Sequence, residues 1–570
     1  MAEEVWMLQT KKADFKQIGA RFRIDPVTAR IIRNRGIEGE AAIDRYLNGT
    51  LDDLYDPMLL KDMERAVSIL CEAVDTGKKI RIVGDYDIDG VCSTYILLQA
   101  FERLGSDVDF EIPDRIKDGY GINESIIEQA HADGVEVLLT CDNGISAFHQ
   151  VELAKKYGMT VVITDHHEVP LDGEKEKIPP ADAVIDPKQA DCPYPFPEIC
   201  GAVVAYKLVQ VLYARRGVPQ MEWLDLLEFA AIATVGDVMK LQDENRILVK
   251  YGLKKMAQTK NLGLRRLAEK NNLDLGAITA YHIGFVIGPC LNAGGRLKTA
   301  KEALALLRAQ SDEEAERLAE ELKELNDTRK DMTEQGTEAA KLQVESWYQK
   351  DKVLVVFLPE CHESLAGIIA GRLREYYQKP AIVLTRGEEA VKGSGRSIDE
   401  YHMFKKLTEV SDLLLKFGGH PLAAGLSLEE KNIDEFRRRL NENAGLTEED
   451  FKAKVWIDVP MPVGYVTERL VRELSCLEPF GQGNEKPLFA EKSLRIRASR
   501  VLGRNRNVVK MTLEETDGHA IEALYFGDGT AFEEERAGRR EIDVVYYPDI
   551  NEYNGRKTLQ AVIRRYKFRG

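Results

Sequence analysis

The sequence of 570 residues has no long hydrophobic run, no C-x-x-C pair and no tandem repeat. A helix that spans a membrane needs about 20 mostly apolar residues. No such run occurs, so we expect no transmembrane helix. The N-terminal segment MAEEVWMLQTKK has acidic residues where a signal peptide is basic, and it lacks an apolar core. These absences predict a cytoplasmic protein.

Cysteine is sparse, with eight residues scattered between Cys71 and Cys476. The two closest, Cys192 and Cys200, are eight positions apart, which fits neither a zinc knuckle nor an iron–sulfur cluster. A reducing compartment also disfavours disulfides. We therefore interpret the cysteines as small buried side chains rather than metal ligands.

Basic residues are fewer than acidic ones, and the formal net charge is −16 at pH 7. Residues 491–570 are an exception, with 16 Lys and Arg against 13 Asp and Glu. Proteins that bind a phosphate backbone non-specifically usually present a basic surface. Any such surface must therefore be local here. An acidic cluster that holds metal ions would account for part of the negative charge.

Apolar runs that end in acidic or histidine residues recur in the first third of the chain. The run 80–83 leads into DYDIDG, the run in VEVLLTCDNGIS ends at Asp142, and the run in MTVVITDHHEVP ends at Asp165. A shorter run, in ADAVIDPK, ends at Asp186. Buried strands that alternate with helical stretches indicate a parallel α/β sheet. The ligand site of such a sheet lies at the carboxyl ends of the strands.

The remainder of the chain changes pattern three times. Residues 301–348 are highly charged, contain one glycine and no proline, and predict a long connecting helix. A second α/β pattern begins at KVLVVFLP, and short β runs separated by turns from about residue 451 predict a small OB-like barrel. We predict an α/β multidomain protein with five parts: an N-terminal extension (1–55), a parallel-sheet domain (56–300), the connecting helix (301–348), a second α/β domain (349–446) and a C-terminal OB-like β-barrel (447–570).

Three carboxylates follow the first strand at alternate positions: Asp85, Asp87 and Asp89. Hard divalent cations prefer oxygen ligands, and two adjacent cations need a carboxylate that bridges them. A calcium loop of the EF-hand type is the alternative. That loop requires a glutamate at its twelfth position, where this chain has Ile96, and a helix rather than a strand before it.

Asp142 and the pair His166-His167 add the other ligand types at neighbouring strand ends. Imidazole mixed with carboxylate suits Mn²⁺, whereas an all-oxygen site suits Mg²⁺. Asp237 lies in an otherwise apolar helical run, LEFAAIATVGDVMKL. A buried aspartate there must be paired or metal-bound, unless it only caps the end of the helix.

Four motifs occur in a set order: GDYDIDG, CDNG, TDHH and VGDV. They resemble the four motifs of the DHH phosphoesterases. Five further segments look like the DHHA1 domain and the C-terminal barrel of the RecJ exonucleases within that group: IPDRIKDGYGI, NAGGR, GSGRS, FGGHPLAAG and EPFGQGNEKPLF. The resemblance covers roughly residues 55–570.

The resemblance implies a single-stranded-DNA-specific 5′→3′ exonuclease that acts in DNA repair and recombination and releases nucleoside 5′-monophosphates. It implies a DHH metal-binding catalytic domain with two Mn²⁺ or Mg²⁺ ions, and a DHHA1 domain that binds substrate. The implied metal ligands are Asp87, Asp89, Asp142, His166 and Asp237, with Asp142 as the bridge.

The other residues of the motifs receive supporting roles from the resemblance. It leaves open whether Asp85 is a ligand or orients one. Asp165 would hydrogen-bond a histidine ring, and His167 would face the scissile phosphate.

The resemblance also places four residues at the terminal phosphate: Arg115, Arg296, Ser394 and Arg396. Glycines beside several of them let the backbone approach an anion, and guanidinium groups match phosphate oxygens. Ordinary turns with surface arginines are the alternative. His420, in the G-G-H motif, is a further candidate for substrate binding, with a purely structural histidine as the alternative. His362 and Ser364, at a predicted helix start, are interpreted as a plain N-cap rather than an acyl-transfer site.

Two other functions remain open. Smaller DHH relatives degrade short oligonucleotides or cyclic dinucleotides but generally lack the barrel, and some relatives are non-catalytic scaffolds. Aromatic residues of the barrel interleaved with arginines could stack single-stranded bases: Tyr525, Phe526, Tyr546, Tyr547 and Tyr553. We expect single-stranded DNA as the substrate, single-strand-binding protein and a RecQ-type helicase as partners, no membrane, and a monomer.

Overall fold

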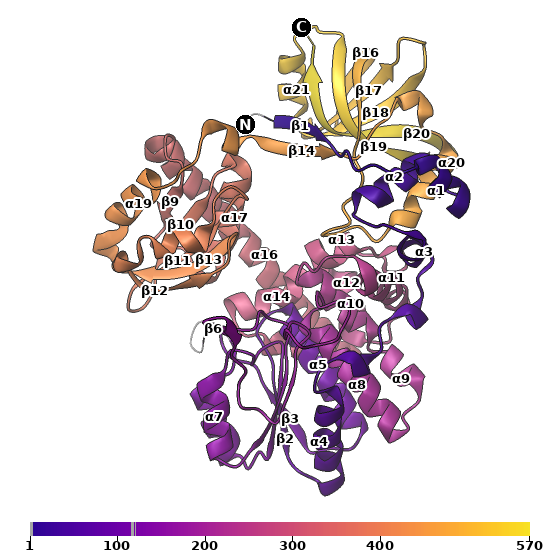
Figure 1. Ribbon diagram of the computed structural model, residues 1–570. Helices are drawn as coiled ribbons and strands as arrows, with labels where there is room; N and C mark the ends of the chain where they lie inside the picture. Colours follow the sequence, from indigo (N-terminus) through magenta and orange to yellow (C-terminus); the bar gives the residue numbers. More distant parts are fainter. Residues whose placement is uncertain (1–3, 116–118, 120, 554, 570) are drawn as a thin grey trace. The chain divides into compact units, whose positions relative to one another are not determined.

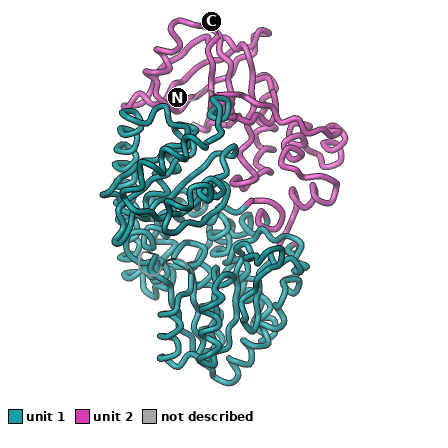
Figure 2. Tube along the Cα trace, turned by 60° about the vertical axis from the view of Figure 1, so that its left-hand side comes forward, with its two compact units in different colours: residues 1–3, 54–239, 247–453 teal, residues 4–53, 240–246, 454–570 magenta. Residues whose placement is uncertain are grey.

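The computed structural model describes residues 4–115, 119, 121–553 and 555–569. The chain forms two compact units (Figure 2). The first unit combines residues 54–239 and 247–453, and the second combines residues 4–53, 240–246 and 454–569. Figure 1 labels the elements of both units. In the described part of the chain, no helix is long and apolar enough to cross a membrane.

A five-stranded parallel sheet forms the centre of the N-terminal half of the first unit, in the order β3-β2-β4-β5-β8. Its strands are β2 (Ile80–Val83), β3 (Val108–Glu111), β4 (Val137–Cys141), β5 (Thr160–Thr164) and β8 (Ala183–Ile185). The inner strands are buried on both faces, which explains their nearly continuous apolar sequences. The predicted parallel sheet is confirmed.

Helices cover both faces of this sheet (Figure 1). The helices of this part of the unit are α4 (Met63–Thr76), α5 (Ile88–Arg103), α6 (Glu124–Ala132), α7 (Phe148–Lys156), α8 (Gly201–Arg216), α9 (Gln220–Leu224), α10 (Leu227–Gly236), α11 (Asp243–Met256), α12 (Leu262–Lys270), α13 (Ala280–His282), α14 (Gly288–Leu297) and α15 (Lys301–Arg308). A short hairpin, β6 (Leu171–Asp172) and β7 (Lys175–Glu176), follows β5.

The connecting helix predicted over 301–348 is interrupted in the structure, because α15 ends at Arg308. The long helix α16 (Asp312–Gln343) begins after the N-cap Ser311 and runs for 32 residues. Its buried positions, among them Leu318 and Leu322, lie on one stripe and the charged positions face away from it.

The second sheet of the first unit has the order β12-β13-β11-β10-β9. Its strands are β9 (Leu354–Phe357), β10 (Ala381–Arg386), β11 (Val391–Arg396), β12 (Leu414–Gly419) and β13 (Ala423–Leu428), with helices α17 (Ala366–Tyr377), α18 (Met403–Thr408) and α19 (Ile433–Glu442). Only the β9–β10 pair is parallel. In this strand order β11 is the central strand, and it carries Ser394 and Arg396.

The second unit contains a closed barrel in the order β15-β16-β17-β18-β20-β19, in which β19 also pairs with β16. The strands are β15 (Val459–Pro460), β16 (Phe489–Leu502), β17 (Val508–Glu514), β18 (Ala520–Phe526), β19 (Glu541–Tyr553) and β20 (Arg556–Phe568), with α20 (Glu468–Leu474) and α21 (Gly529–Arg536). The predicted barrel is confirmed.

The N-terminal segment belongs to this second unit. It forms β1 (Glu4–Leu8), α1 (Phe15–Phe22), α2 (Pro26–Asn34) and α3 (Glu40–Asn48), and β1 pairs with β14 (Ala453–Ile457). Arg35 forms a buried ion pair with Asp458, with Nη1 and Oδ1 2.7 Å apart. Ile31 and Ile32 are part of the hydrophobic core of the barrel unit. The segment therefore contributes to the barrel's stability.

Candidate metal centre and phosphate cavity

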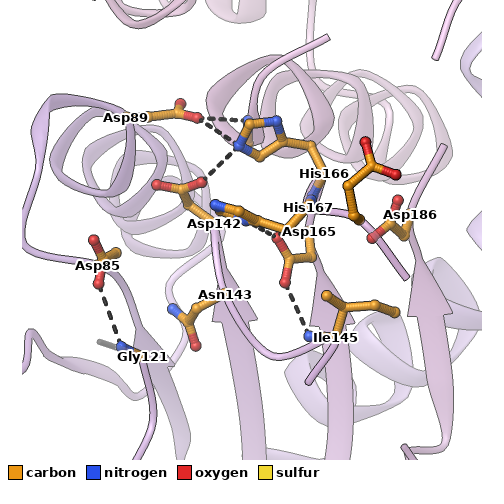
Figure 3. A network of polar contacts seen from close by, with 12 residues as sticks. Asp85, Asp89, Gly121, Asp142, Asn143, Ile145, Asp165, His166, His167 and Asp186 are labelled. Atoms are coloured by element: carbon orange, nitrogen blue, oxygen red, sulfur yellow. Dashed lines mark hydrogen bonds and ion pairs between the residues drawn. The ribbon is translucent and has the colours of Figure 1, made fainter. Parts of the chain in front are cut away.

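The acidic and histidine residues lie at the carboxyl ends of the parallel strands (Figure 3). Asp85 follows β2, Asp142 follows β4, and Asp165 follows β5 directly before His166 and His167. Neighbouring parallel strands end at the same edge of a sheet, which brings residues far apart in sequence together.

Three groups of these side chains could each hold a metal ion, with ligand atoms that lie within 4.8 Å of one another. The groups are Asp142 with His166 and His167, Asp89 with His166 and Asp237, and Asp85 with Asp87 and Asp142. Because Asp142 and His166 each occur in two groups, the arrangement can hold two cations side by side.

The loop after β2 is held by its own hydrogen bonds. Asp87 is the N-cap of α5, and its Oδ1 accepts from the backbone N–H groups of Asp89 at 2.9 Å and Gly90 at 3.2 Å. A Cβ at Gly90 would lie 2.4 Å from the carbonyl oxygen of Asp85, so only glycine fits there. Asp85 Oδ2 is buried, and it has no hydrogen-bond partner among the residues described.

The sequence interpretation missed the N-terminus of α8. The backbone N–H groups of Gly201 and Ala202 donate to the two carboxylate oxygens of Asp89, each at 2.7 Å. A Cβ at Gly201 would lie 2.7 Å from the Cβ of Asp142. The helix end therefore orients Asp89 and stabilises its negative charge. The only signal in the sequence was a glycine at the start of an apolar helix.

Carboxylates crowd one another in this site. Burial, together with the charge of Asp89, raises the pKa of Asp142 well above its usual value. Burial and the charge of Asp87 raise the pKa of Asp85 to about 8. Asp142 also adopts φ of 60°, a left-handed conformation that is strained for a residue other than glycine. Such crowding is costly unless cations neutralise it, so the donor set fits divalent metal ions.

The two histidines differ in their electrostatics. His166 Nε2 lies 3.0 Å from Asp142 Oδ1 and 3.4 Å from Asp89 Oδ2, and burial lowers the pKa of His166. A neutral imidazole is the form that binds metals. Burial also opposes charge on His167. However, the hydrogen bond between its Nδ1 and Asp165, together with the charge of Asp165, outweighs burial and raises the pKa of His167 to about 9.

Asp237 follows α10, and its Oδ2 lies 3.8 Å from His166 Nε2. The sequence suggested a buried aspartate, but 31% of this side chain is exposed. Burial and the charge of Asp89 raise its pKa to about 8. Asp237 therefore lies at the solvent side of the cluster rather than beneath it.

Two buried residues near the strand ends were not assigned a role from the sequence. Asn143 donates through its side-chain amide to the carbonyl oxygens of Val83 at 3.1 Å and Cys141 at 2.9 Å, which ties the ends of β2 and β4 together. Asp186, at the end of β8, is fully buried, and burial raises its pKa to about 7.

A second site of the first unit is a cavity of about 270 Å³ in which four of the five predicted substrate-binding residues meet. Its lining residues are Arg115, Arg296, Glu363, Ser364, Gly367, Ile368, Ser394 and Arg396. They come from α14, α17 and β11, from the short 3-10 turn Glu363–Leu365 before α17, and from the loop after β3. Three arginines around one cavity are typical of a site for a multiply charged anion.

The arginines repel one another in this cavity. Burial, followed by the charge of Arg115, lowers the pKa of Arg296 to about 10. Burial also lowers the pKa of Arg396. Arg115 stacks over the ring of Tyr86, with its guanidinium carbon 4.8 Å from the ring centroid. Because Tyr86 stands between Asp85 and Asp87, this contact connects the cavity to the metal-binding loop.

His420 is not part of this cavity. It is exposed after β12, where its backbone N–H donates to the carbonyl oxygen of Ala423 at 2.7 Å. The structure therefore separates His420 from the four residues with which the sequence grouped it.

The aromatic residues of the barrel divide into core and surface. Tyr546 and Tyr547 are buried, Tyr525 is half-buried, and 59% of Phe526 is exposed. The side chain of Tyr553 lies outside the described residues. Of the described aromatic residues in that predicted set, Phe526 is therefore the one whose ring is exposed enough to stack on a base.

Three family models match the chain in order: the DHH family N-terminal domain (residues 79–234), the DHHA1 domain (350–445) and the RecJ OB domain (457–565). The single-stranded-DNA-specific exonuclease RecJ of Bacillus subtilis is 36% identical over 564 residues, which cover 98% of this chain and 70% of that protein. RecJ of Escherichia coli is 34% identical over 563 residues, which cover 95% of each chain. The crystal structure of Thermus thermophilus RecJ in complex with Mn²⁺ has a TM-score of 0.84 at 28% identity, and the match covers 99% of this chain and 79% of that one.

Proposed function

This chain belongs to the RecJ family of single-stranded-DNA-specific exonucleases, and on that premise we propose that it degrades single-stranded DNA in the 5′→3′ direction. The products are nucleoside 5′-monophosphates, and the reaction is metal-dependent phosphodiester hydrolysis. The observation that carries this proposal is the combination in one unit of a two-cation cluster and a three-arginine cavity.

Two Mn²⁺ or Mg²⁺ ions fit the cluster, and the Thermus thermophilus relative was solved in complex with each of these metals. We propose Asp87, Asp89, Asp142, His166 and Asp237 as the ligands, with Asp142 between the two ions, and Asp85 as a ligand or an orienting group. When bound, the ions activate water and stabilise the charge that develops on the scissile phosphate and the departing oxygen.

The chain's own groups prepare the site for that chemistry. The N-terminus of α8 holds Asp89 in one orientation through two backbone N–H groups. Asp165 holds the ring of His167 and keeps it protonated at neutral pH. A cationic His167 can donate a hydrogen bond to a non-bridging phosphate oxygen, where negative charge increases during the reaction.

The arginine cavity would set the 5′→3′ direction in which the strand is degraded. A metal cluster alone cleaves a phosphodiester bond but does not distinguish one end of a strand from the other. Arg115, Arg296, Ser394 and Arg396 would bind the terminal 5′-phosphate and place the first phosphodiester at the ions. Exposed His420 would contact the strand elsewhere.

Substrate comparison tests the proposal. With Mn²⁺, the protein should release mononucleotides from a 5′-phosphorylated single strand and leave the blunt duplex of the same sequence intact. Rapid cleavage of a dinucleotide with little action on the long strand would favour the short-oligonucleotide relatives instead. Binding without cleavage at any metal concentration would favour a scaffold.

Several further properties remain part of the proposal. The barrel would hold the strand through Phe526 and the basic residues of 491–570. We propose action in the cytoplasm, as a monomer, in DNA repair and recombination, with single-strand-binding protein and a RecQ-type helicase as partners.

A further inference from the structure

The helix start with the sequence CHES, which was interpreted as a plain N-cap, also lines the arginine cavity. Ser364 is buried, with 6% of its surface exposed, and it is one of the cavity's lining residues. Its backbone carbonyl oxygen accepts a hydrogen bond from Arg296 Nη1 at 3.0 Å. Ser364 is therefore in direct contact with one of the predicted phosphate-binding arginines.

The hydroxyl of Ser364 is held by His362. The Nδ1 atom of His362 lies 2.7 Å from Ser364 Oγ, and the backbone N–H of Ser364 lies 3.4 Å from the same nitrogen. The longer contact is the N-cap expected from the sequence. The shorter contact is not required for capping, and it fixes the position of the hydroxyl oxygen.

The next turn of the helix approaches the other phosphate contacts. A Cβ at Gly367 would lie 3.0 Å from Ser394 Oγ and 2.8 Å from an Nη atom of Arg396. The absence of a side chain at this position thus lets the helix backbone approach these two side chains closely. Ser364 and the first turn of α17 thus line the same cavity as Ser394 and Arg396 of β11.

We propose that Ser364 is a further ligand of the terminal 5′-phosphate and that His362 is the residue that positions its hydroxyl. This inference rests on the proposed function of the cavity. A hydroxyl can donate one hydrogen bond while it accepts another. With phosphate bound, Ser364 donates its proton to a phosphate oxygen and accepts from His362 Nδ1, which in that tautomer carries the ring proton and no longer accepts from the backbone N–H of Ser364.

Ser364 and His362 together add selectivity for a terminal phosphate that the arginines alone do not supply. Guanidinium groups attract any phosphate of the strand, whereas a hydroxyl whose position is fixed by His362 adds a directed hydrogen bond to the additional free oxygen of a terminal phosphate. A hydrogen bond to a charged group typically accounts for about a tenfold difference in affinity or more.

Binding without metal provides the test, because cleavage then does not interfere. The full-length protein in EDTA is titrated against two 3′-fluorescein-labelled oligonucleotides of one sequence, with a 5′-phosphate or a 5′-hydroxyl, and Kd is measured by anisotropy. Ser364→Ala should weaken binding of the phosphorylated strand about tenfold and leave the hydroxyl strand unchanged. Thr408→Ala is the matched control, because it removes an exposed hydroxyl that bonds only locally, to the carbonyl oxygen of Phe404 at 3.0 Å.

His362 is tested by two substitutions that separate capping from positioning. His362→Ala should weaken phosphate recognition as much as Ser364→Ala, and the double variant should be no weaker than either single variant. His362→Asn restores a cap. The amide oxygen of this asparagine accepts the capping hydrogen bond but cannot donate one to Ser364 Oγ. The variant should therefore regain the wild-type melting temperature without regaining selectivity for the 5′-phosphate.

Three results would overturn the inference. If Ser364→Ala keeps the wild-type ratio of the two Kd values, Ser364 does not contact the phosphate, although the function proposed for the cavity stands. If His362→Asn restores the ratio together with the melting temperature, His362 acts only as a cap. If the wild-type protein itself does not distinguish the two strands, the end-selection part of the proposed function fails as well.

Discussion

Asp165 Oδ1 lies 2.7 Å from His167 Nδ1, and it also accepts a hydrogen bond from the backbone N–H of His167 at 3.2 Å. The other oxygen, Oδ2, accepts from the backbone N–H of Ile145 at 2.9 Å. Asp165 itself is fully buried, and these hydrogen bonds lower its pKa against the effect of burial. One carboxylate thus sets both the position and the charge of His167.

Asp165→Asn should therefore lower kcat by about tenfold to a hundredfold, because His167 loses the partner that keeps it protonated. The folded-state pKa of His167 is raised above its ordinary value, so this pairing stabilises the fold at low pH and is lost as pH rises through about 9. Nucleotide release measured at saturating Mn²⁺ and pH 7.5 checks the effect. Unchanged kcat with an intact circular dichroism spectrum would remove His167 from the mechanism.

Asp142→Ala should abolish hydrolysis, because this residue belongs to two of the candidate metal groups and cannot be replaced without separating the ions. A thermal shift assay provides the companion measurement. Mn²⁺ should raise the melting temperature of the wild-type protein and have little effect on the variant. Retention of a tenth of the wild-type turnover would contradict the bridging role.

Arg396→Ala should reduce kcat/KM on 5′-phosphorylated single strands about tenfold to a hundredfold and have little effect on 5′-hydroxyl strands. Only the phosphorylated end presents a dianion to the arginine cavity. The ratio of kcat/KM for the two substrates, compared between wild type and variant, reports the effect. An unchanged ratio would place Arg396 elsewhere along the strand.

Phe526→Ala should weaken metal-free binding of single-stranded DNA by about fivefold or more, since stacking on an exposed ring contributes roughly 1–3 kcal/mol per base. Binding should also weaken steeply with added salt. The full chain is needed for this test. Arg246 is buried in the barrel unit and donates to the carbonyl oxygens of Cys476 and Leu477, so an excised barrel would lose these contacts. Equal affinities would make the barrel a structural element.

Glu228→Gln should stabilise the protein above neutral pH. Burial raises the pKa of Glu228 to about 7, while Thr259 donates a hydrogen bond to it at 2.7 Å. An acid whose folded-state pKa is raised loses stability as pH rises from its unfolded pKa to its folded one. The difference between variant and wild type in the free energy of unfolding should therefore grow by about 3 kcal/mol from pH 4.5 to pH 7 and stay constant above. Urea denaturation at a series of pH values measures it, and a difference that does not vary with pH would show that Glu228 is ionised throughout.

Much of the candidate site could be predicted because its residues belong to local patterns. Three of the five strands, β2, β4 and β5, are followed at once or after one glycine by Asp85, Asp142 and Asp165, and strands of one parallel sheet end at a common edge. The spacing within the loop after β2 and the residue types were therefore sufficient to predict a metal centre. The closed barrel was also predictable, since apolar β runs alternate with turn residues, although β16, β19 and β20 are longer than the short runs that the sequence indicated.

Other features could not be predicted, because they depend on contacts between distant segments. Gly201 orients Asp89 across 112 positions of sequence, and Arg296 reaches the carbonyl oxygen of Ser364 across 68. His420 was predicted from its motif only as a possible substrate contact, and it lies outside the cavity lined by the other four predicted substrate-binding residues.

The sequence by itself thus determined which chemistry is available, because residue type and local spacing decide which groups follow each strand. The tertiary structure decided which groups share a site, how deeply each is buried and which proton each holds. Those properties follow from the packing of helix ends and strand ends against one another, because burial and the charges that packing brings close together shift the pKa of a buried group.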